Sequence, residues 1–110
     1  MKGGATTLEC LMANDHRQNA QNRAEALLGL LRNDSHQSEL QGLIVECEAL
    51  ARAIAAFHME GIRFRMFNVD RLLTKGSLPL PAELPAIFAD MRRELEAAGF
   101  HTRSHQSPTA

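Results

Sequence analysis

The feature that most constrains the fold is a run of apolar residues spaced alternately three and four positions apart. Its members are Leu40, Leu43, Cys47, Leu50, Ile54 and Phe57. This spacing places the six side chains on one face of an α-helix, and it is the spacing with which helices pack closely on other helices. The chain contains no alternation of apolar and polar residues of the kind typical of strands. The sequence therefore predicts an all-α fold.

The apolar pattern and its breaks define four predicted helices. Residues 7–32 lack proline, carry apolar residues along one face and are followed by turn-forming residues at 33–35. The spaced run extends over a second helix, which we place at 36–67, and the two helices form a long antiparallel hairpin. A short helix at 69–75 follows. Beyond a proline-containing linker, an amphipathic stripe predicts a C-terminal helix at 82–98, with Gly99 as its left-handed cap.

The length of 110 residues predicts a single domain. We expect a flexible N-terminus at 1–5, one helical domain at 6–100 and a disordered polar tail at 101–110. No secretory signal precedes the two cysteines, and no apolar run reaches the roughly 18–20 residues that cross a bilayer. These features predict a cytoplasmic protein with free thiols. Nothing in the sequence indicates a cofactor.

Residues 57–73 hold more large apolar side chains than one helical face can carry. Helical numbering places one group on one flank and a second group nearly opposite: Phe57, Phe64 and Phe67 against Ile62, Met66, Val69 and Leu73. Two interpretations remain open. The chain breaks near Gly61 or Asn68, or the helix is continuous and is covered on both sides.

This double-sided segment predicts a partner. A helix of about 30 residues is about 45 Å long, longer than a compact globule of this size can cover. We therefore expect a homodimer that completes a helical bundle, acting as a small protein–protein interaction, regulatory or adaptor protein. Its interface anchors are Phe57, Ile62, Phe64, Met66 and Phe67, with Arg63 and Arg65 as charges at the rim. The alternatives are a monomer that bends at Gly61 and a complex with another protein.

A metal-binding helical bundle is a second hypothesis. In a hairpin that turns near residue 34, His58 comes close to Cys10 and Glu9. A thiolate, an imidazole and a carboxylate are ligands for zinc or another soft metal. The alternative is a histidine that is hydrogen-bonded within the core.

A nucleic-acid-linked function is the third hypothesis. The stretch "RAIAAFH", from Arg52 to His58, resembles the Arg-x(4–6)-His pattern of HEPN-type helical ribonucleases. That resemblance implies an Arg–His pair that acts on RNA at a dimer interface, although Ala53 stands where the family commonly has a polar residue. A DNA-binding regulator would use the basic residues between 63 and 75. The net charge of −1, with acidic and basic residues intermixed, argues against nonspecific phosphate binding.

Overall fold

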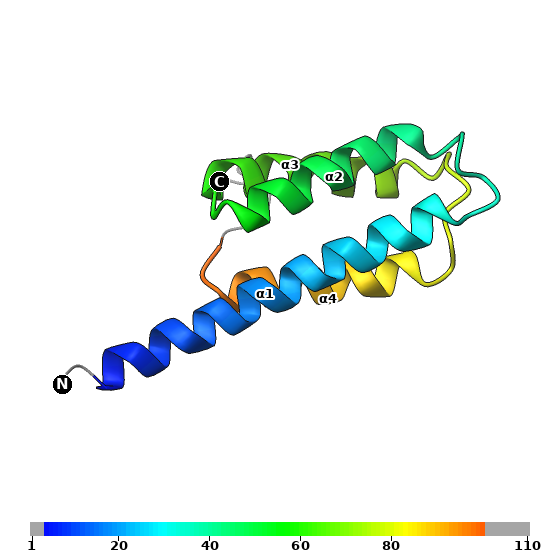
Figure 1. Cartoon of the computed structure of the whole chain (residues 1–110). Coiled ribbons are helices and arrows are strands. Elements are labelled where there is room, and N and C mark those ends of the chain that lie inside the picture. Colours follow the sequence, from blue (N-terminus) through cyan, green and yellow to red (C-terminus); the bar gives the residue numbers. More distant parts are fainter. Residues whose placement is uncertain (1–3, 101–110) are drawn as a thin grey trace.

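The computed structural model describes the backbone of residues 4–100 and the side chains of residues 15–100. It contains four α-helices: α1 (Gly4–Arg32), α2 (Gln41–Ala55), α3 (Met59–Thr74) and α4 (Leu84–Ala97) (Figure 1). No strand occurs between residues 4 and 100, so the predicted all-α class is confirmed. The expected disordered tail at 101–110 and the first three residues of the flexible N-terminus lie outside the described residues, and α1 already begins at Gly4.

The helices are arranged in two layers. α2 lies beside α3 in one layer, α1 lies beside α4 in the other, and α1 also packs against α2 between the layers (Figure 1). An ion pair of 3.7 Å between Arg92 Nη2 and Asp70 Oδ1 links α4 to α3. Each helix therefore has one side toward the core, and the far side of the α2–α3 layer faces solvent.

The core is built from the periodic apolar residues of all four helices. Its largest fully buried side chains are Leu27, Leu31, Leu40, Leu43, Leu50, Ile54, Ile62, Met66, Val69, Leu84, Met91 and Leu95. The predicted seam is confirmed from Leu40 to Ile54, and it fails at Phe57, which is 55% exposed. The predicted stripe of the C-terminal helix is confirmed as well, because Leu84, Phe88, Met91 and Leu95 are all buried.

The predicted continuous helix at 36–67 and the short helix at 69–75 are wrong. The chain breaks at 56–58, and a single helix, α3, spans both sides of Asn68. The break is a left-handed helix end: Phe57 has a φ of 58°, Phe57 N donates to Ile54 O, and His58 N donates to Ala53 O. Glycine is the usual residue at such a position, so a phenylalanine at 57 does not mark the break locally.

His58 begins the next helix directly after that turn. It has an extended backbone, and its Nδ1 accepts a hydrogen bond of 2.8 Å from the backbone N–H of Gly61. A histidine ring here takes the place of the usual Ser, Thr, Asp or Asn cap. The tight contact also requires glycine at 61, because a Cβ there would lie 2.7 Å from His58 Nδ1.

The other helix ends follow the sequence more closely. At the end of α4, Gly99 has a φ of 97° and Phe100 N donates to Leu95 O, so the predicted glycine cap is confirmed. The turn after α1 is longer than predicted and reaches residue 40. Asp34 stabilises it, since its carboxylate accepts a hydrogen bond of 2.7 Å from His36 N.

The first third of α1 extends past the other helices (Figure 1). α1 has 29 residues, against 15 in α2 and 14 in α4. At 1.5 Å per residue it is about 43 Å long, about twice the length of either neighbour. The overhang leaves the bundle at the same end as the α2–α3 turn.

Candidate protein-binding surface

Four large apolar side chains are exposed in the described part of the chain, and all of them lie in the α2–α3 layer or in its turn. They are Val45 (54% exposed), Phe57 (55%), Met59 (41%) and Phe64 (50%). They belong to two surfaces. The end surface consists of Phe57 and Met59 at the α2–α3 turn. The outer face consists of Val45, Ala49 and Arg52 of α2, Ala56 directly after the end of α2, and Phe64 of α3.

The two opposite flanks predicted for residues 57–73 differ in burial. Ile62 and Met66, which we expected to anchor an interface, are core residues with no exposed surface. The physical reason is the break at 56–58: α3 folds back beside α2 and turns this flank onto the chain's own core. Phe67 is half-buried, with the guanidinium of Arg71 5.8 Å from its ring centre. Only Phe57 and Phe64 of the predicted anchors are largely open to solvent.

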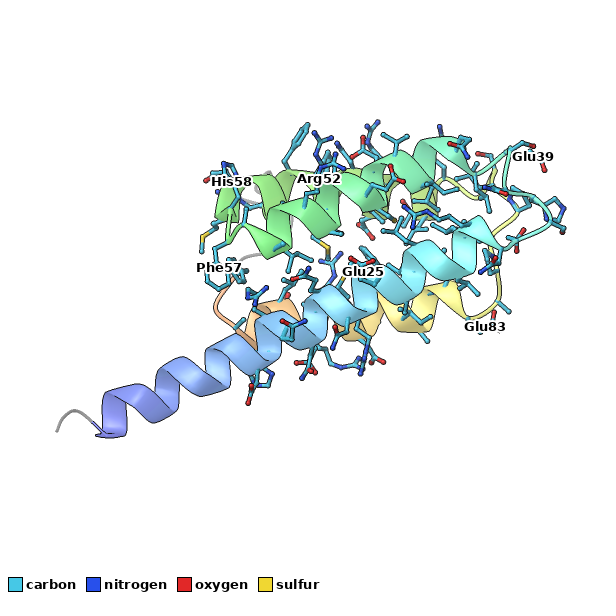
Figure 2. All side chains as sticks on the ribbon, viewed as in Figure 1. Glu25, Glu39, Arg52, Phe57, His58 and Glu83 are labelled. Carbon is cyan, nitrogen blue, oxygen red and sulfur yellow. The ribbon has the colours of Figure 1, made fainter. Side chains whose placement is uncertain are left out.

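The end surface is organised around Phe57 (Figure 2). The Arg17 guanidinium of α1 lies 4.6 Å from the centre of its ring, and the Phe100 ring lies 6.4 Å from it. Arg17 is itself held by a hydrogen bond of 2.9 Å from its Nη1 to Gln21 Oε1. A cation over an aromatic face and a tilted aromatic pair both orient the ring. Phe57 is therefore fixed in place although half of it contacts solvent.

Residues of the outer face come together because α2 and α3 are antiparallel. Glu46 accepts a hydrogen bond from Asn68 Nδ2, and Gly61 packs against Ala53. These two pairs fix which residues of α2 and α3 lie opposite each other. Phe64 is then level with Leu50, within one turn of Arg52. Val45, Ala49, Arg52 and Ala56 follow each other at helical spacing on the side of α2 opposite its buried seam.

The two arginines predicted to lie at an interface rim are engaged within the chain. Arg63 Nη2 lies 2.8 Å from Glu60 Oε2, and Arg65 Nη1 lies 3.1 Å from Glu46 Oε1. The Arg65 guanidinium also lies 5.0 Å from the centre of the Phe64 ring. These pairs leave little uncompensated positive charge along this part of α3, where the sequence suggested a basic patch.

Arg52 and His58, the pair suggested by the ribonuclease pattern, are not brought together. Figure 2 shows Arg52 within α2 and His58 at the turn after it. No contact joins the two side chains in the described structure, and His58 Nδ1 is occupied by the Gly61 amide. His58 caps the start of α3, and Arg52 is an exposed residue of α2.

Of the three predicted metal ligands, only His58 is among the described side chains. The side chains of Cys10 and Glu9 lie outside the described residues. Among the side chains that are described, no group of three or more potential ligands comes together. The other cysteine, Cys47, is buried between the layers. Burial, with the nearby carboxylates of Glu46 and Glu48, raises the pKa of its thiol to about 12, so it stays protonated at neutral pH.

An open groove of about 660 Å³ lies between the end of α1 and the start of α4. It is lined by backbone turns and small or apolar residues, with Asp34 and Glu83 as its only acids among the lining residues. No nucleophile or histidine lines it, and it contains none of the residues proposed above as catalytic or metal-binding.

Comparison with known proteins adds no assignment. The chain matches no protein-family model, no curated protein and no solved structure. Among the described residues, none of the helices is long and apolar enough to cross a membrane.

Sequence reasoning missed five members of these surfaces: Val45, Ala49, Ala56, Met59 and, in a binding role, Arg52. A signal for Val45 and Arg52 was present. Both lie opposite the buried seam of α2, seven residues apart, so they share one exposed face. Met59 could not be placed without knowing that the helix breaks just before it.

Proposed function

We propose that the protein is a small protein–protein interaction module, in an adaptor or regulatory role, that acts as a homodimer. The observation that carries this proposal is the half-exposed Phe57 ring on a backbone with positive φ. A non-glycine residue in that conformation costs about 1–2 kcal/mol. Such outliers cluster at functional sites, where the side chain is needed despite its backbone cost.

The exposed apolar area supports the same proposal. A phenylalanine side chain offers about 150–250 Å², so Phe57 and Phe64 together leave roughly 150–250 Å² in contact with water. Val45 and Met59 bring the total to a few hundred Å². This area is divided between the end surface and the outer face, and each of them offers one half-exposed aromatic ring to a partner.

The overhang of α1 supports a second copy as the partner of the end surface. A helical segment without tertiary packing is marginal in water, so the first third of α1 needs a surface to pack on. It leaves the bundle at the end that carries the α2–α3 turn (Figure 1). In a two-fold dimer, the overhang of each copy lies across the end surface of the other, and each contact is formed twice.

A nucleic-acid function, whether as a DNA-binding regulator or as a ribonuclease, has weaker support. The arginines near the exposed aromatic rings are largely paired with acids, and the net charge is −1. A nucleic-acid surface instead presents several free cations to successive phosphates. A salt titration of binding to duplex DNA and to single-stranded RNA tests this alternative, and a steep salt dependence at micromolar affinity would favour it.

Solution mass measurement tests the dimer. Light scattering coupled to size-exclusion chromatography should give twice the chain mass of 12.2 kDa for the wild type. Phe57→Asn should shift the protein to the monomer, since asparagine tolerates positive φ but lacks the ring. Phe64→Asn is the matched control, because it removes an equally exposed ring from the outer face and should leave the dimer intact.

Two results would contradict the proposal. A wild-type mass equal to one chain at about 100 μM protein would exclude a dimer of ordinary strength. Dissociation by Phe64→Asn, with no effect of Phe57→Asn, would assign the contact to the wrong surface. Circular dichroism of both variants verifies that they remain helical.

A further inference from the structure

Arg52 differs from every other arginine between residues 15 and 100. Each of the others makes an ion pair, a side-chain hydrogen bond or a contact with an aromatic ring, with partners on α1, α2, α3 or α4. Arg52 makes none of these contacts within the described chain and is exposed on α2 (Figure 2). Its guanidinium is available to a carboxylate from outside the molecule.

The other side chains of the outer face around Arg52 are apolar. Val45 is 54% exposed two turns before it, and Phe64 is 50% exposed on the neighbouring helix at nearly the same level. Ala49 lies between Val45 and Arg52, and Ala56 lies one turn beyond Arg52 on the same side. These small side chains allow another backbone to come close. From Val45 to Ala56 the face is about 16 Å long, three helical turns. A face with one cation between two apolar side chains is complementary to an amphipathic helix that carries one acid on its apolar face.

We infer that the outer face binds an amphipathic helix of another protein, and that an Asp or Glu among its apolar residues pairs with Arg52. This inference rests on the proposed function as an interaction module, and it names the class of partner. The apolar residues of the bound helix cover Val45 and Phe64. The carboxylate accepts hydrogen bonds from the guanidinium at the centre of the contact, where bulk water is excluded.

A second copy of this chain does not fit the outer face. The acids beside it, Glu46, Glu48 and Glu60, are already paired with Arg65, Arg32 and Arg63. A two-fold contact through this face would bring two Arg52 side chains to one interface with no free carboxylate between them. Like charges without a partner oppose association, so the complementary acid belongs to a different protein.

A nucleic acid fits the outer face less well than a helix does. A polyanion needs several cations in a row, and Arg52 is a single cation between Val45 and Phe64. Glu46, next to Val45 in α2, would also repel a phosphate backbone. The isolated charge suits a single carboxylate in an apolar contact.

Selection from a helical peptide library tests the inference. The probe is a phage-displayed library of 16-residue amphipathic helices with four randomised positions on the apolar face, selected against the full chain. Peptides selected by the wild type should carry Asp or Glu at one randomised position and large apolar residues at the others. Their affinity, measured by fluorescence anisotropy, should fall about tenfold or more with Arg52→Gln or when the acid is replaced by its amide.

Controls separate this inference from the proposed function. Arg93→Gln removes the same charge from α4 and should leave peptide affinity unchanged, whereas Arg52→Glu should select Lys or Arg in place of the acid. Peptides that depend on Phe64 but not on Arg52 would overturn the inference and leave the interaction module standing. Failure to select any peptide, or binding of a 20-nucleotide single-stranded RNA that depends on Arg52, would also overturn it. The mass measurement reports on the dimer in every case.

Discussion

The turn between α2 and α3 leads to a quantitative prediction at Phe57. Because its φ is 58°, alanine is strained there as phenylalanine is, and glycine is not. We compare two variants that both lack the ring, Phe57→Ala and Phe57→Gly. Each of them loses the contacts with Arg17 and Phe100, and only the second relieves the backbone.

The magnitudes follow from the exposure of the ring. Phe57 is 55% exposed, so roughly 90 Å² of its side chain is buried, worth about 2 kcal/mol. The Arg17 contact adds about 0.5–1 kcal/mol. Phe57→Ala should therefore lower the free energy of unfolding by about 2–3 kcal/mol. Phe57→Gly loses the same contacts but regains about 1–2 kcal/mol of strain, reduced by about 0.4–1 kcal/mol for the greater freedom of glycine in the unfolded chain.

The glycine variant should thus be more stable than the alanine variant by about 0.8 kcal/mol, the midpoint of a range of about 0–1.6 kcal/mol, measured by urea denaturation followed by circular dichroism. The control is Ala56→Gly, one residue earlier, where φ is −90°. Glycine there should destabilise by about 0.5–1 kcal/mol. An alanine variant at 57 as stable as the glycine variant would show that the turn lacks a positive φ, and the argument for Phe57 would fail with it.

Two further predictions concern other helices. Gly61→Ala should lower the free energy of unfolding by about 1–3 kcal/mol, measured by urea denaturation, because the added methyl group meets His58 Nδ1 at 2.7 Å. The control is Gly42→Ala, which has open space around it and should raise the free energy of unfolding by about 0.5–1 kcal/mol. Equal effects at both sites would contradict the close approach at Gly61. The hydrogen bond of 2.7 Å with His16 lowers the pKa of Glu94 in the folded protein. The stability that this hydrogen bond contributes is therefore complete above the ordinary pKa of Glu94, and it is lost as the pH falls through the lowered pKa of the folded protein. Urea denaturation between pH 3 and 6 should show a shallower pH dependence for Glu94→Gln, and identical wild-type and variant profiles would refute it.

Much of the fold could be predicted from the sequence because the core residues recur at helical spacing. The seam from Leu40 to Ile54 and the stripe from Leu84 to Leu95 are both buried as expected. Local signals also sufficed at Gly99, where glycine marks the end of α4. In these places the residue type and the backbone conformation agree.

The prediction failed where the residue type and the backbone conformation disagree. Phe57 continues the apolar spacing of α2, and nothing in its chemistry suggests a left-handed turn. His58 is an unusual helix cap. Gly61 was one of two candidate break points in a helix predicted to continue to residue 67, whereas the structure places it inside α3, where it leaves room for the His58 ring. Tertiary contacts from Arg17 and Phe100 hold the turn at Phe57, and such distant contacts cannot be read from local spacing.

This one turn decides which surface the protein presents. A helix rotates by 100° per residue, so moving the break by one position would turn a different flank of α3 toward the core. With the break at 56–58, Ile62, Met66 and Val69 face inward, and Phe64 is left on the outer face near Arg52. The same turn holds Phe57 at the end of the bundle. Both proposed binding surfaces therefore depend on a backbone conformation that phenylalanine disfavours, which is why the glycine and alanine variants at position 57 test the structural basis of both.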